Sequence, residues 1–380
     1  MYFFSYLCAE YTPHLDEQWL TNNTMSKYIK ILFKVAFSFA FFYVLLSFVK
    51  SNELIAIIKQ VDPLFMGISF SVTFVMLLAS CAKWKVVLDV KGKKIPFFEL
   101  LKIYMVGYFF SNILPSTVGG DVVRSYYAGR IIENQAYSAV SVFVERFSGI
   151  LFLLVLVIVA PLFQPHLYSS PYIFFPSCAG LFFLFVILWV WISKNPFALP
   201  NLIAEKIFSF VHKVVKKTGL QFLIVIAEKS EAFYLKILDK LKKFRAELQV
   251  AIKAVKNDKQ FLFRIIYLTI LFYILTWVNV YTAYRAFGVE VDFIQICAIV
   301  PAIMLVAHVP VTLLGNLGYF ESVFVFYFLL VGVGGAESLA MGLLLRLKTL
   351  TMGIIGFGVY LLYKQRNVLD LELVKANEKR

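Results

Sequence analysis

Long apolar runs dominate this sequence and restrict the folds that are open to it. Four of them, Tyr28–Val49, Leu64–Ala82, Tyr172–Ile192 and Phe261–Ala286, approach or exceed the ~20 residues that a helix needs to cross a bilayer. Hydrophobic residues make up 61% of the chain and charged residues only 16%, so the chain is more hydrophobic than an ordinary soluble domain. We therefore predict an all-α polytopic integral membrane protein.

The distribution of charge predicts the topology. Residues 83–94 carry five lysines against one aspartate, and residues 193–260 carry 14 Lys or Arg against six Asp or Glu. Since basic loops stay on the cytoplasmic side, both regions are expected there, together with the N-terminal segment 1–27 and the charged tail 366–380. We expect residues 28–365 to form the membrane domain, in the cell inner membrane. The basic surplus is explained by this rule, so no nucleic-acid partner is expected.

Three apolar stretches, Phe97–Leu114, Ala136–Phe163 and Tyr172–Ile192, lie between the two basic regions. Three full crossings would place those regions on opposite sides of the membrane. The conflict disappears if one stretch enters and returns. Proline and glycine break a helix, and irregular backbone at membrane depth is tolerated where protein or water covers it. We predict that residues 97–130 form a re-entrant hairpin, broken at Pro115 and open to the cytoplasm.

A second break resembles the first. Pro310-Val-Thr-Leu-Leu-Gly-Asn316 agrees with Pro115-Ser-Thr-Val-Gly-Gly-Asp121 at four of the six positions after the proline: Thr, an apolar residue, Gly, and Asp or Asn. A longer apolar stretch with an arginine follows each. This indicates an internal repeat. If Val291–Gly334 enters from the outer face, the repeat is inverted, as in many transporters. Two full crossings within Val291–Leu330 satisfy the charge equally well, so both alternatives stay open here.

The complete expectation is about six full spans plus two broken hairpins. The helix-breaking residues are Pro115, Pro310, Gly315 and Gly318.

Ionisable residues inside the apolar runs are the candidate functional groups. Glu145 and Arg146 lie deep in one run, where each costs about 2.5–3.5 kcal/mol to insert. Such residues either lock helices together as ion pairs or line a polar path; both interpretations stay open. Partners are expected at Asp121, Arg124, Glu321 or Arg346. The predicted substrate-binding residues are Gly119, Gly120, Asp121, Arg124, Glu145, Arg146, Asn316, Glu321 and Arg346.

The stretch from Gly119 to Arg124 suits an anion. Two glycines leave backbone N–H groups approachable, a helix N-terminus favours negative charge, and the guanidinium of Arg124 follows one turn later. Asp121 has the alternative role of a helix cap. The four cysteines are scattered without metal-binding spacing, so we expect neither a disulfide nor a metal site. The sequence shows no nucleophile motif and no nucleotide-binding loop, so we expect no cofactor and no catalytic residue.

Other segments have simpler interpretations. Apolar and lysine residues alternate at helical spacing in 193–260, which predicts amphipathic helices lying on anionic lipid; packing against another protein domain is the alternative. Lys83 and Trp84 are expected to anchor a span at the interface. Gly342, Gly353 and Gly356 are expected where helices pack closely.

The ordered motifs NILPSTVGGDVVR, VERFSGI, GNLGYFES and LLLRL resemble the lysylphosphatidylglycerol synthase transmembrane-region family over residues 30–365. Gly315–Asn316 stands where that pattern has a Gly-Gly pair. The resemblance implies a flippase for an aminoacylated, anionic or polyprenyl-linked lipid. Nothing in the sequence matches the soluble lysyltransferase domain of the full-length enzymes, which favours a non-enzymatic role and leaves that question open.

The leading hypothesis is therefore a lipid transporter whose partners are membrane lipids with anionic headgroups. A membrane-embedded lipid transferase and a small-solute or ion carrier are the alternatives. A homo-oligomer and a separate lipid-modifying enzyme are further partners that we consider.

Overall fold

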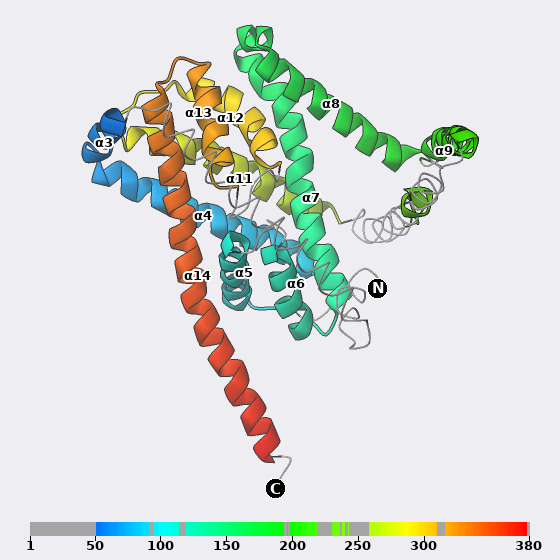
Figure 1. The fold of residues 1–380 in the computed structure, drawn as a ribbon. Helices are drawn as coiled ribbons and strands as arrows, with labels where there is room; N and C mark the ends of the chain where they lie inside the picture. The colour runs from blue at the N-terminus through cyan, green and yellow to red at the C-terminus, as the bar shows by residue number, and fades with distance from the viewer. Residues whose placement is uncertain are drawn as a thin grey trace. The chain divides into compact units, whose positions relative to one another are not determined.

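A computed structural model describes residues 51–377, except 91–93, 114–118, 194–195, 197, 219–229, 236–237, 240–241, 243–257 and 310–315. The helices among these residues are α3 Ser51–Lys59, α4 Pro63–Leu88, α5 Phe97–Ile113, α6 Gly119–Ile131, α7 Gln135–Val159, the short η1 Ala160–Phe163 and η2 Pro165–Ser169, α8 Pro171–Ile192, α9 Ala198–Thr218, α11 Lys259–Arg285, α12 Phe293–Ala307, α13 Tyr319–Leu329 and α14 Gly335–Asn377. No strand occurs within these ranges, and the predicted all-α fold is confirmed (Figure 1).

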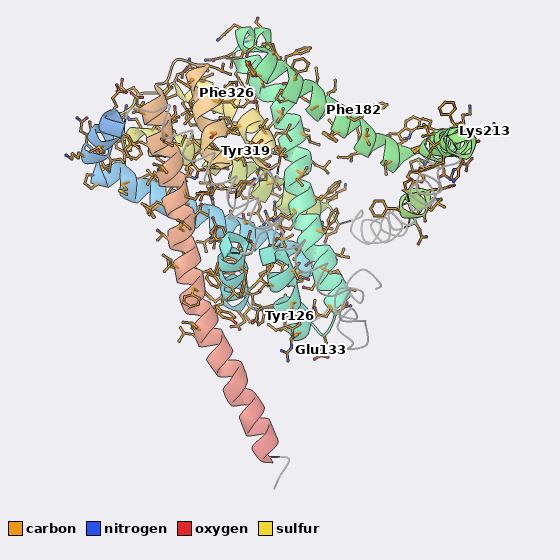
Figure 2. All side chains as sticks on the ribbon, viewed as in Figure 1. Tyr126, Glu133, Phe182, Lys213, Tyr319 and Phe326 are labelled. Atoms are coloured by element: carbon orange, nitrogen blue, oxygen red, sulfur yellow. The ribbon has the colours of Figure 1, made fainter. Side chains whose placement is uncertain are left out.

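Five segments are long and apolar enough to cross a membrane: Pro63–Leu88, Gln135–Phe163, Pro171–Val190, Lys259–Arg285 and Gly335–Leu362. They coincide with five of the spans expected from the sequence. The expected first span, Tyr28–Val49, lies outside the described residues. On α8, large apolar side chains such as Phe175 and Phe182 are more than half exposed, as expected of a surface that faces lipid (Figure 2).

Local capping explains where several of these helices begin. Asp62 accepts hydrogen bonds from the backbone N–H groups of Leu64 and Phe65 and precedes a proline at the first position of α4. Asn134 accepts from the N–H of Tyr137 at the start of α7. Asp292 caps α12 in the same way. These caps fix the ends of the helices that carry the charged residues.

The chain divides into two compact units, one of residues Met1–Ser177 with Arg264–Arg380 and the other of Cys178–Phe263. The larger unit contains two helical hairpins. In the first, α5 packs against α6; in the second, α12 packs against α13. Both hairpins pack on long helices, since α6 lies against α7, and both α5 and α13 lie against α14. The charged residues predicted from the sequence lie on this set of helices.

The two hairpins occupy different parts of the larger unit. Figure 1 shows α5 beside the middle of α14, with α6 on its other side, and α13 beside the N-terminal part of α14, with α12 next to α13. The long helices that follow the hairpins, α7 and α14, run in opposite directions in that view. Figure 2 likewise shows Tyr126 on the first hairpin in the lower part of the view and Phe326 on the second in the upper part. This opposed arrangement agrees with an inverted repeat.

Helix length favours the broken-hairpin interpretation of Val291–Leu330. α12 has 15 residues and α13 has 11, which correspond to about 22 Å and 16 Å at the usual rise of a helix. The hydrocarbon core of a bilayer is about 30 Å thick. Each helix is too short to cross it alone, whereas a hairpin of the two can enter and return.

Close packing brings α5 against both neighbours. A Cβ atom on Gly120 of α6 would lie 2.0 Å from the carbonyl oxygen of Gly107 and from Oγ of Ser111 on α5. On the other side, a Cβ on Gly356 of α14 would lie 2.3 Å from the Met105 carbonyl oxygen, and Gly353 approaches Asn112. The predicted packing role of Gly353 and Gly356 is confirmed. The fold therefore holds α6, α5 and α14 in direct succession.

Candidate functional site

Asp121 and Arg124 form the first part of a charged cluster on the α5–α6 hairpin. They lie one turn apart in α6, and Arg124 Nε donates to Asp121 Oδ1 at 3.0 Å. Arg124 is only 2% exposed. Its guanidinium lies 5.0 Å from the ring centroid of Trp84 and 4.9 Å from that of Tyr104. Aromatic faces therefore cover part of a cation that water cannot reach.

Glu145 connects this helix to two others. Its Oε2 accepts from Arg124 Nη2 at 2.8 Å, and its Oε1 lies 3.4 Å from Lys83 Nζ. Glu145 is 4% exposed and Lys83 5%. One carboxylate on α7 thus engages cations from α6 and α4. Through these contacts Glu145 joins α4, α6 and α7. Removing one partner from such a buried pair would leave an uncompensated charge, so the contacts hold the three helices together.

Arg146, the next residue along α7, points elsewhere. Its Nη2 donates to Asp121 Oδ1 at 3.0 Å, and half of its side chain is exposed. Adjacent residues on a helix do not share a face. Asp121 therefore accepts from two arginines, one buried and one exposed. Arg146 is the accessible cation of this cluster.

The cluster carries a surplus of positive charge. Lys83, Arg124 and Arg146 are opposed by two carboxylates, Asp121 and Glu145, which leaves one positive charge. In addition, Nη1 of Arg124 is buried and has no hydrogen-bond partner among the described residues. Such a cluster, in apolar surroundings, favours the approach of one further anion.

A second cluster lies at the start of α13. Gly318, with φ of +80°, precedes the helix, and its N–H donates to Glu321 Oε2 at 2.8 Å. The other oxygen of Glu321 accepts from Arg346 Nε of α14 at 2.7 Å. Glu321 is fully buried, and the Arg346 guanidinium lies 5.4 Å from the ring centroid of Phe320. An acid in the first turn of a short helix is again bound to an arginine on the following long helix.

The two acid–arginine pairs share one spacing. Asp121 and Arg146 are 25 residues apart, and so are Glu321 and Arg346. The second pair follows the first by 200 residues, and so does the start of α14 relative to that of α7. This relation is an internal repeat in a different register from the proline motif, which aligned Asp121 with Asn316.

Asn316 has a separate structural role. Its side-chain amide donates to the carbonyl oxygens of Ala307 and Val309, each at 3.0 Å, so it caps the end of α12. Its φ is +60°, a conformation that asparagine adopts more readily than most residues. Asn316 is therefore not grouped with the acid–arginine pairs.

Helix α5 separates the two clusters. A Cβ atom on its residue Gly107 would lie 3.1 Å from Cβ of Arg124 on α6, and Asn112 donates to the Thr349 carbonyl oxygen of α14 at 3.3 Å. Helix α5 therefore lies between α6 and α14, the helices that carry Arg124 and Arg346.

The remaining predicted site residues are placed as follows. Gly120 is buried against α5, which gives it a packing role, and Gly119 begins α6. The helix-breaking residues Pro115, Pro310 and Gly315 lie outside the described residues. A ligand-binding role for Gly119 and Gly120 therefore remains a prediction.

The expectation for Lys83 and Trp84 is wrong. Both are buried rather than at an interface, and the Trp84 indole N–H donates to Ser141 Oγ at 2.9 Å. The lysine lies near the end of an apolar run, where sequence alone suggests an anchor that reaches the surface. Its carboxylate partner, Glu145, comes 62 residues later, so no local spacing could reveal the pair.

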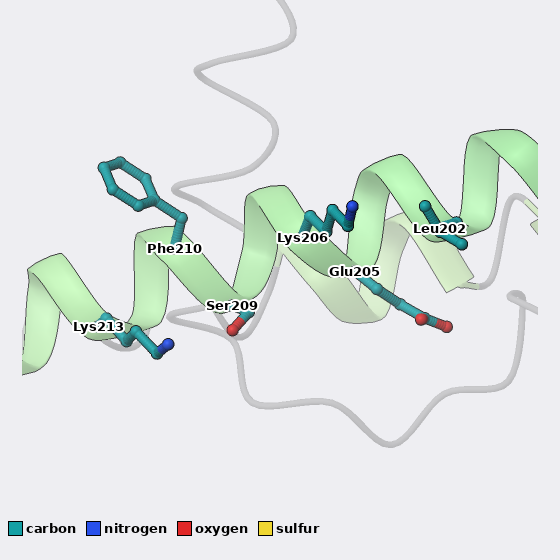
Figure 3. A pocket seen from close by; sticks show the side chains of 6 residues that line it. All are labelled: Leu202, Glu205, Lys206, Ser209, Phe210 and Lys213. Carbon is teal, nitrogen blue, oxygen red and sulfur yellow. The ribbon is translucent and has the colours of Figure 1, made fainter.

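Two other features of the described residues bear on chemistry. They contain no group of three or more His, Cys, Asp or Glu that could hold a metal ion. On α9, a shallow open hollow is lined by Leu202, Glu205, Lys206, Ser209, Phe210 and Lys213 (Figure 3). All six residues lie on one helix, so this hollow is a feature of the α9 surface and not an enclosed site.

Comparisons with known proteins support a membrane function. A UPF0104 membrane protein of Methanothermobacter thermautotrophicus is 22% identical over 305 residues, covering 78% of this chain and 84% of the relative. Another, from Methanocaldococcus jannaschii, is 24% identical over 97 residues, or 25% of this chain. The match spans only 29% of that second relative's length. No solved structure matches the chain.

The family described as lysylphosphatidylglycerol synthase TM region matches residues 31–356, which include both hairpins and both acid–arginine pairs. The match covers far more than half of the 380 residues. This chain, a multi-pass membrane protein, belongs to the lysylphosphatidylglycerol synthase transmembrane-region family.

Proposed function

We propose that this protein is a lipid transporter that moves an anionic lipid headgroup across the membrane, and that the Asp121–Arg146 pair receives the headgroup phosphate. The observation that carries this proposal is the half-exposed Arg146, which lies well inside a span yet belongs to a cluster with one surplus positive charge. A phosphodiester carries one negative charge, so its binding neutralises the cluster.

The binding step is an exchange of partners on Arg146. A phosphate oxygen takes the place of Asp121 Oδ1, and a guanidinium binds phosphate through paired N–H donors. Asp121 keeps its second donor, Arg124, at 3.0 Å. The buried part of the cluster therefore does not have to rearrange. The acyl chains stay in lipid, beside the exposed apolar surface of the spans.

The second acid–arginine pair, Glu321 and Arg346, gives the headgroup an equivalent binding site in the other repeat. Arg346 is bound to Glu321 as Arg146 is bound to Asp121, but its side chain is only 13% exposed. In this structure, the first pair is thus more accessible than the second. In an inverted repeat, exposing the pairs alternately would open the path first to one face and then to the other.

The basic helix α9 fits the same function. Lys206 and Lys213 project from it beside the exposed Phe210 (Figure 3). Lysines and exposed apolar side chains on one helix are typical of a helix that lies on anionic lipid. The proposal places α9 at the cytoplasmic face of the inner membrane, with both termini on that side. Much of the rest of the predicted amphipathic region 193–260 lies outside the described residues.

A membrane-embedded lipid transferase is the main alternative. It would require a carboxylate free to exchange a proton with substrate. Both oxygens of Glu145 and both of Glu321 are instead engaged by donors within the fold. A small-solute carrier is the other alternative, and it differs in having no preference for a lipid probe.

The direct test uses purified protein in phosphatidylcholine vesicles that contain a trace of fluorescent phosphatidylglycerol. Dithionite added outside bleaches only outer-leaflet label, so it reports movement between leaflets. We expect vesicles with protein to lose inner-leaflet fluorescence much faster than empty vesicles, and a phosphatidylcholine probe to move more slowly. Equal rates with and without protein would contradict the proposal. A radiolabelled lipid converted to a new product would instead favour the transferase.

A further inference from the structure

Lys348 is buried near the middle of a span and was not singled out by the sequence. It lies on α14, between Gly335 and Leu362, and is 1% exposed. Its Nζ donates to Ser69 Oγ of α4 at 2.7 Å and to Asn279 Oδ1 of α11 at 2.5 Å. Thr73 of α4 also donates to Asn279 Oδ1, at 3.2 Å. The lysine thus joins three helices through neutral groups.

The absence of an acid distinguishes this lysine from Lys83. Lys83 lies 3.4 Å from a carboxylate oxygen of Glu145, whereas Lys348 forms no ion pair within the described part of the chain. Removing an ammonium group from water without a carboxylate partner is costly. The neutral amine avoids that cost. Unlike arginine, lysine gives up its proton readily when it is buried.

The charged and titratable groups on the surrounding helices are engaged elsewhere. Glu321 of α13 binds Arg346, and the hydroxyl of Tyr273 on α11 donates to the Gly149 carbonyl oxygen. Helices α4 and α11 present Ser69, Thr73 and Asn279 to the lysine, and none of these ionises in the accessible pH range. Arg346 lies two residues away on α14 itself.

The hydrogen-bond partners suit both protonation states. The ammonium donates to Ser69 Oγ and to Asn279 Oδ1. After the Nζ–H bond breaks and the proton leaves to water, the amine has a lone pair. A serine hydroxyl both donates and accepts, so the Ser69 O–H can turn to donate to that lone pair. The amine continues to donate to Asn279. Ser69 and Asn279 therefore remain hydrogen-bonded to Lys348 in both states.

We propose that Lys348 is a proton-binding site that couples headgroup transport to proton movement. This inference rests on the proposed transport function and names its driving ion. Lys348 and Arg346 lie on the same helix, α14, but face different neighbours: Arg346 pairs with Glu321 of α13, whereas Lys348 contacts α4 and α11. Loss of the proton turns charge-assisted hydrogen bonds to Ser69 and Asn279 into weaker neutral ones, so it loosens the contact of α14 with α4 and α11. The proton thereby acts on the helix that carries the second acid–arginine pair.

The test compares wild type with Lys348→Arg, which stays charged, and Lys348→Met, which stays neutral. Lys102→Met is the control, because Lys102 is 47% exposed and pairs with Glu99 on the surface of α5. Fluorescent phosphatidylglycerol movement is measured in vesicles with and without an imposed pH gradient. A difference of one pH unit changes a one-proton equilibrium by about tenfold. We expect the gradient to change the rate several-fold in wild type and in the control, and not in either Lys348 variant.

A second measurement does not depend on transport. Potentiometric titration of the purified proteins across the neutral range should show about one more proton exchanged per chain in wild type than in either Lys348 variant. A gradient response retained in Lys348→Arg, or equal proton counts in all proteins, would overturn the inference. If wild type exchanges the extra proton but moves no lipid, the transport function fails and the proton site stands.

Discussion

At the scale of single residues, two neighbours on α7 have opposite tasks. Glu145 faces inward and holds Arg124 and Lys83, whereas Arg146 faces an accessible side and meets Asp121. The first contact binds helices together. The second leaves a cation within reach of a ligand. Glu145 therefore contributes to stability, whereas the next residue, Arg146, is available for binding.

This separation predicts different consequences for two alanine substitutions. Arg124→Ala leaves Glu145 without its closer partner and should lower the free energy of unfolding by about 3–5 kcal/mol. Arg146→Ala removes a half-exposed pair and should cost no more than about 1 kcal/mol. Thermal unfolding of the purified variants in detergent measures both. Equal losses of stability would contradict this difference, because both arginines would then have the same structural role.

Sequence reasoning identified most of these residues but not their pairing. Charges such as Glu145 and Arg346 stand out in apolar runs because each is costly to insert. The partner of each depends on which helices pack together, and no local spacing contains that information. Lys348 escaped notice because its partners, Ser69 and Asn279, are neutral and lie on distant parts of the chain.

At the scale of helices, the α5–α6 hairpin depends on contact between two glycines. Gly120→Ala places a methyl group 2.0 Å from the Gly107 carbonyl oxygen, so the helices must separate. We expect a loss of about 1–3 kcal/mol in stability. Gly358→Ala is the matched control, since a Cβ there meets nothing within 4 Å. It should be neutral or slightly stabilising. Similar unfolding temperatures for the two variants would refute this account of the hairpin.

The second hairpin predicts a pattern of labelling. Glu290 and Val309 lie near the two ends of α12, and both are exposed. In a cysteine-free background, Glu290→Cys should react with a membrane-impermeant maleimide from one side. For a re-entrant hairpin, Val309→Cys should not react from the opposite side. Labelling of Val309→Cys from that opposite side would establish two full crossings instead.

The sequence predicted the existence of both hairpins through their proline and glycine breaks. It could not decide whether Val291–Leu330 crosses the membrane, because a hairpin and a double crossing return the chain to the same side. The lengths of α12 and α13 favour the hairpin, and lengths follow from where Asp292 and Gly318 set the helix starts.

At the scale of the whole molecule, the larger unit is built from two repeats. Each half contains a broken hairpin, a long helix and an acid–arginine pair with the same 25-residue separation. The sequence also indicated a repeat, but in another register. The proline motif aligns Asp121 with Asn316, whereas the ion pairs align Asp121 with Glu321. The ion pairs reveal the correspondence because they connect a hairpin to the helix after it.

If both repeats take part in transport, Arg346→Ala should impair phosphatidylglycerol movement as Arg146→Ala does, by about tenfold or more for the loss of a charged contact. The same vesicle assay measures both variants, with protein incorporation matched. Normal transport by Arg346→Ala would restrict the function to the first repeat.

The most direct test of the account compares Arg146→Ala with Arg130→Ala in that assay. Both arginines belong to the region of the first hairpin and both are exposed, but Arg130 stacks on Tyr126 and takes no part in the charged cluster. We expect Arg146→Ala to lose most of the protein-dependent movement of phosphatidylglycerol, and Arg130→Ala to remain close to wild type. Unchanged movement in a folded Arg146→Ala protein would contradict the central claim that this arginine receives the lipid phosphate.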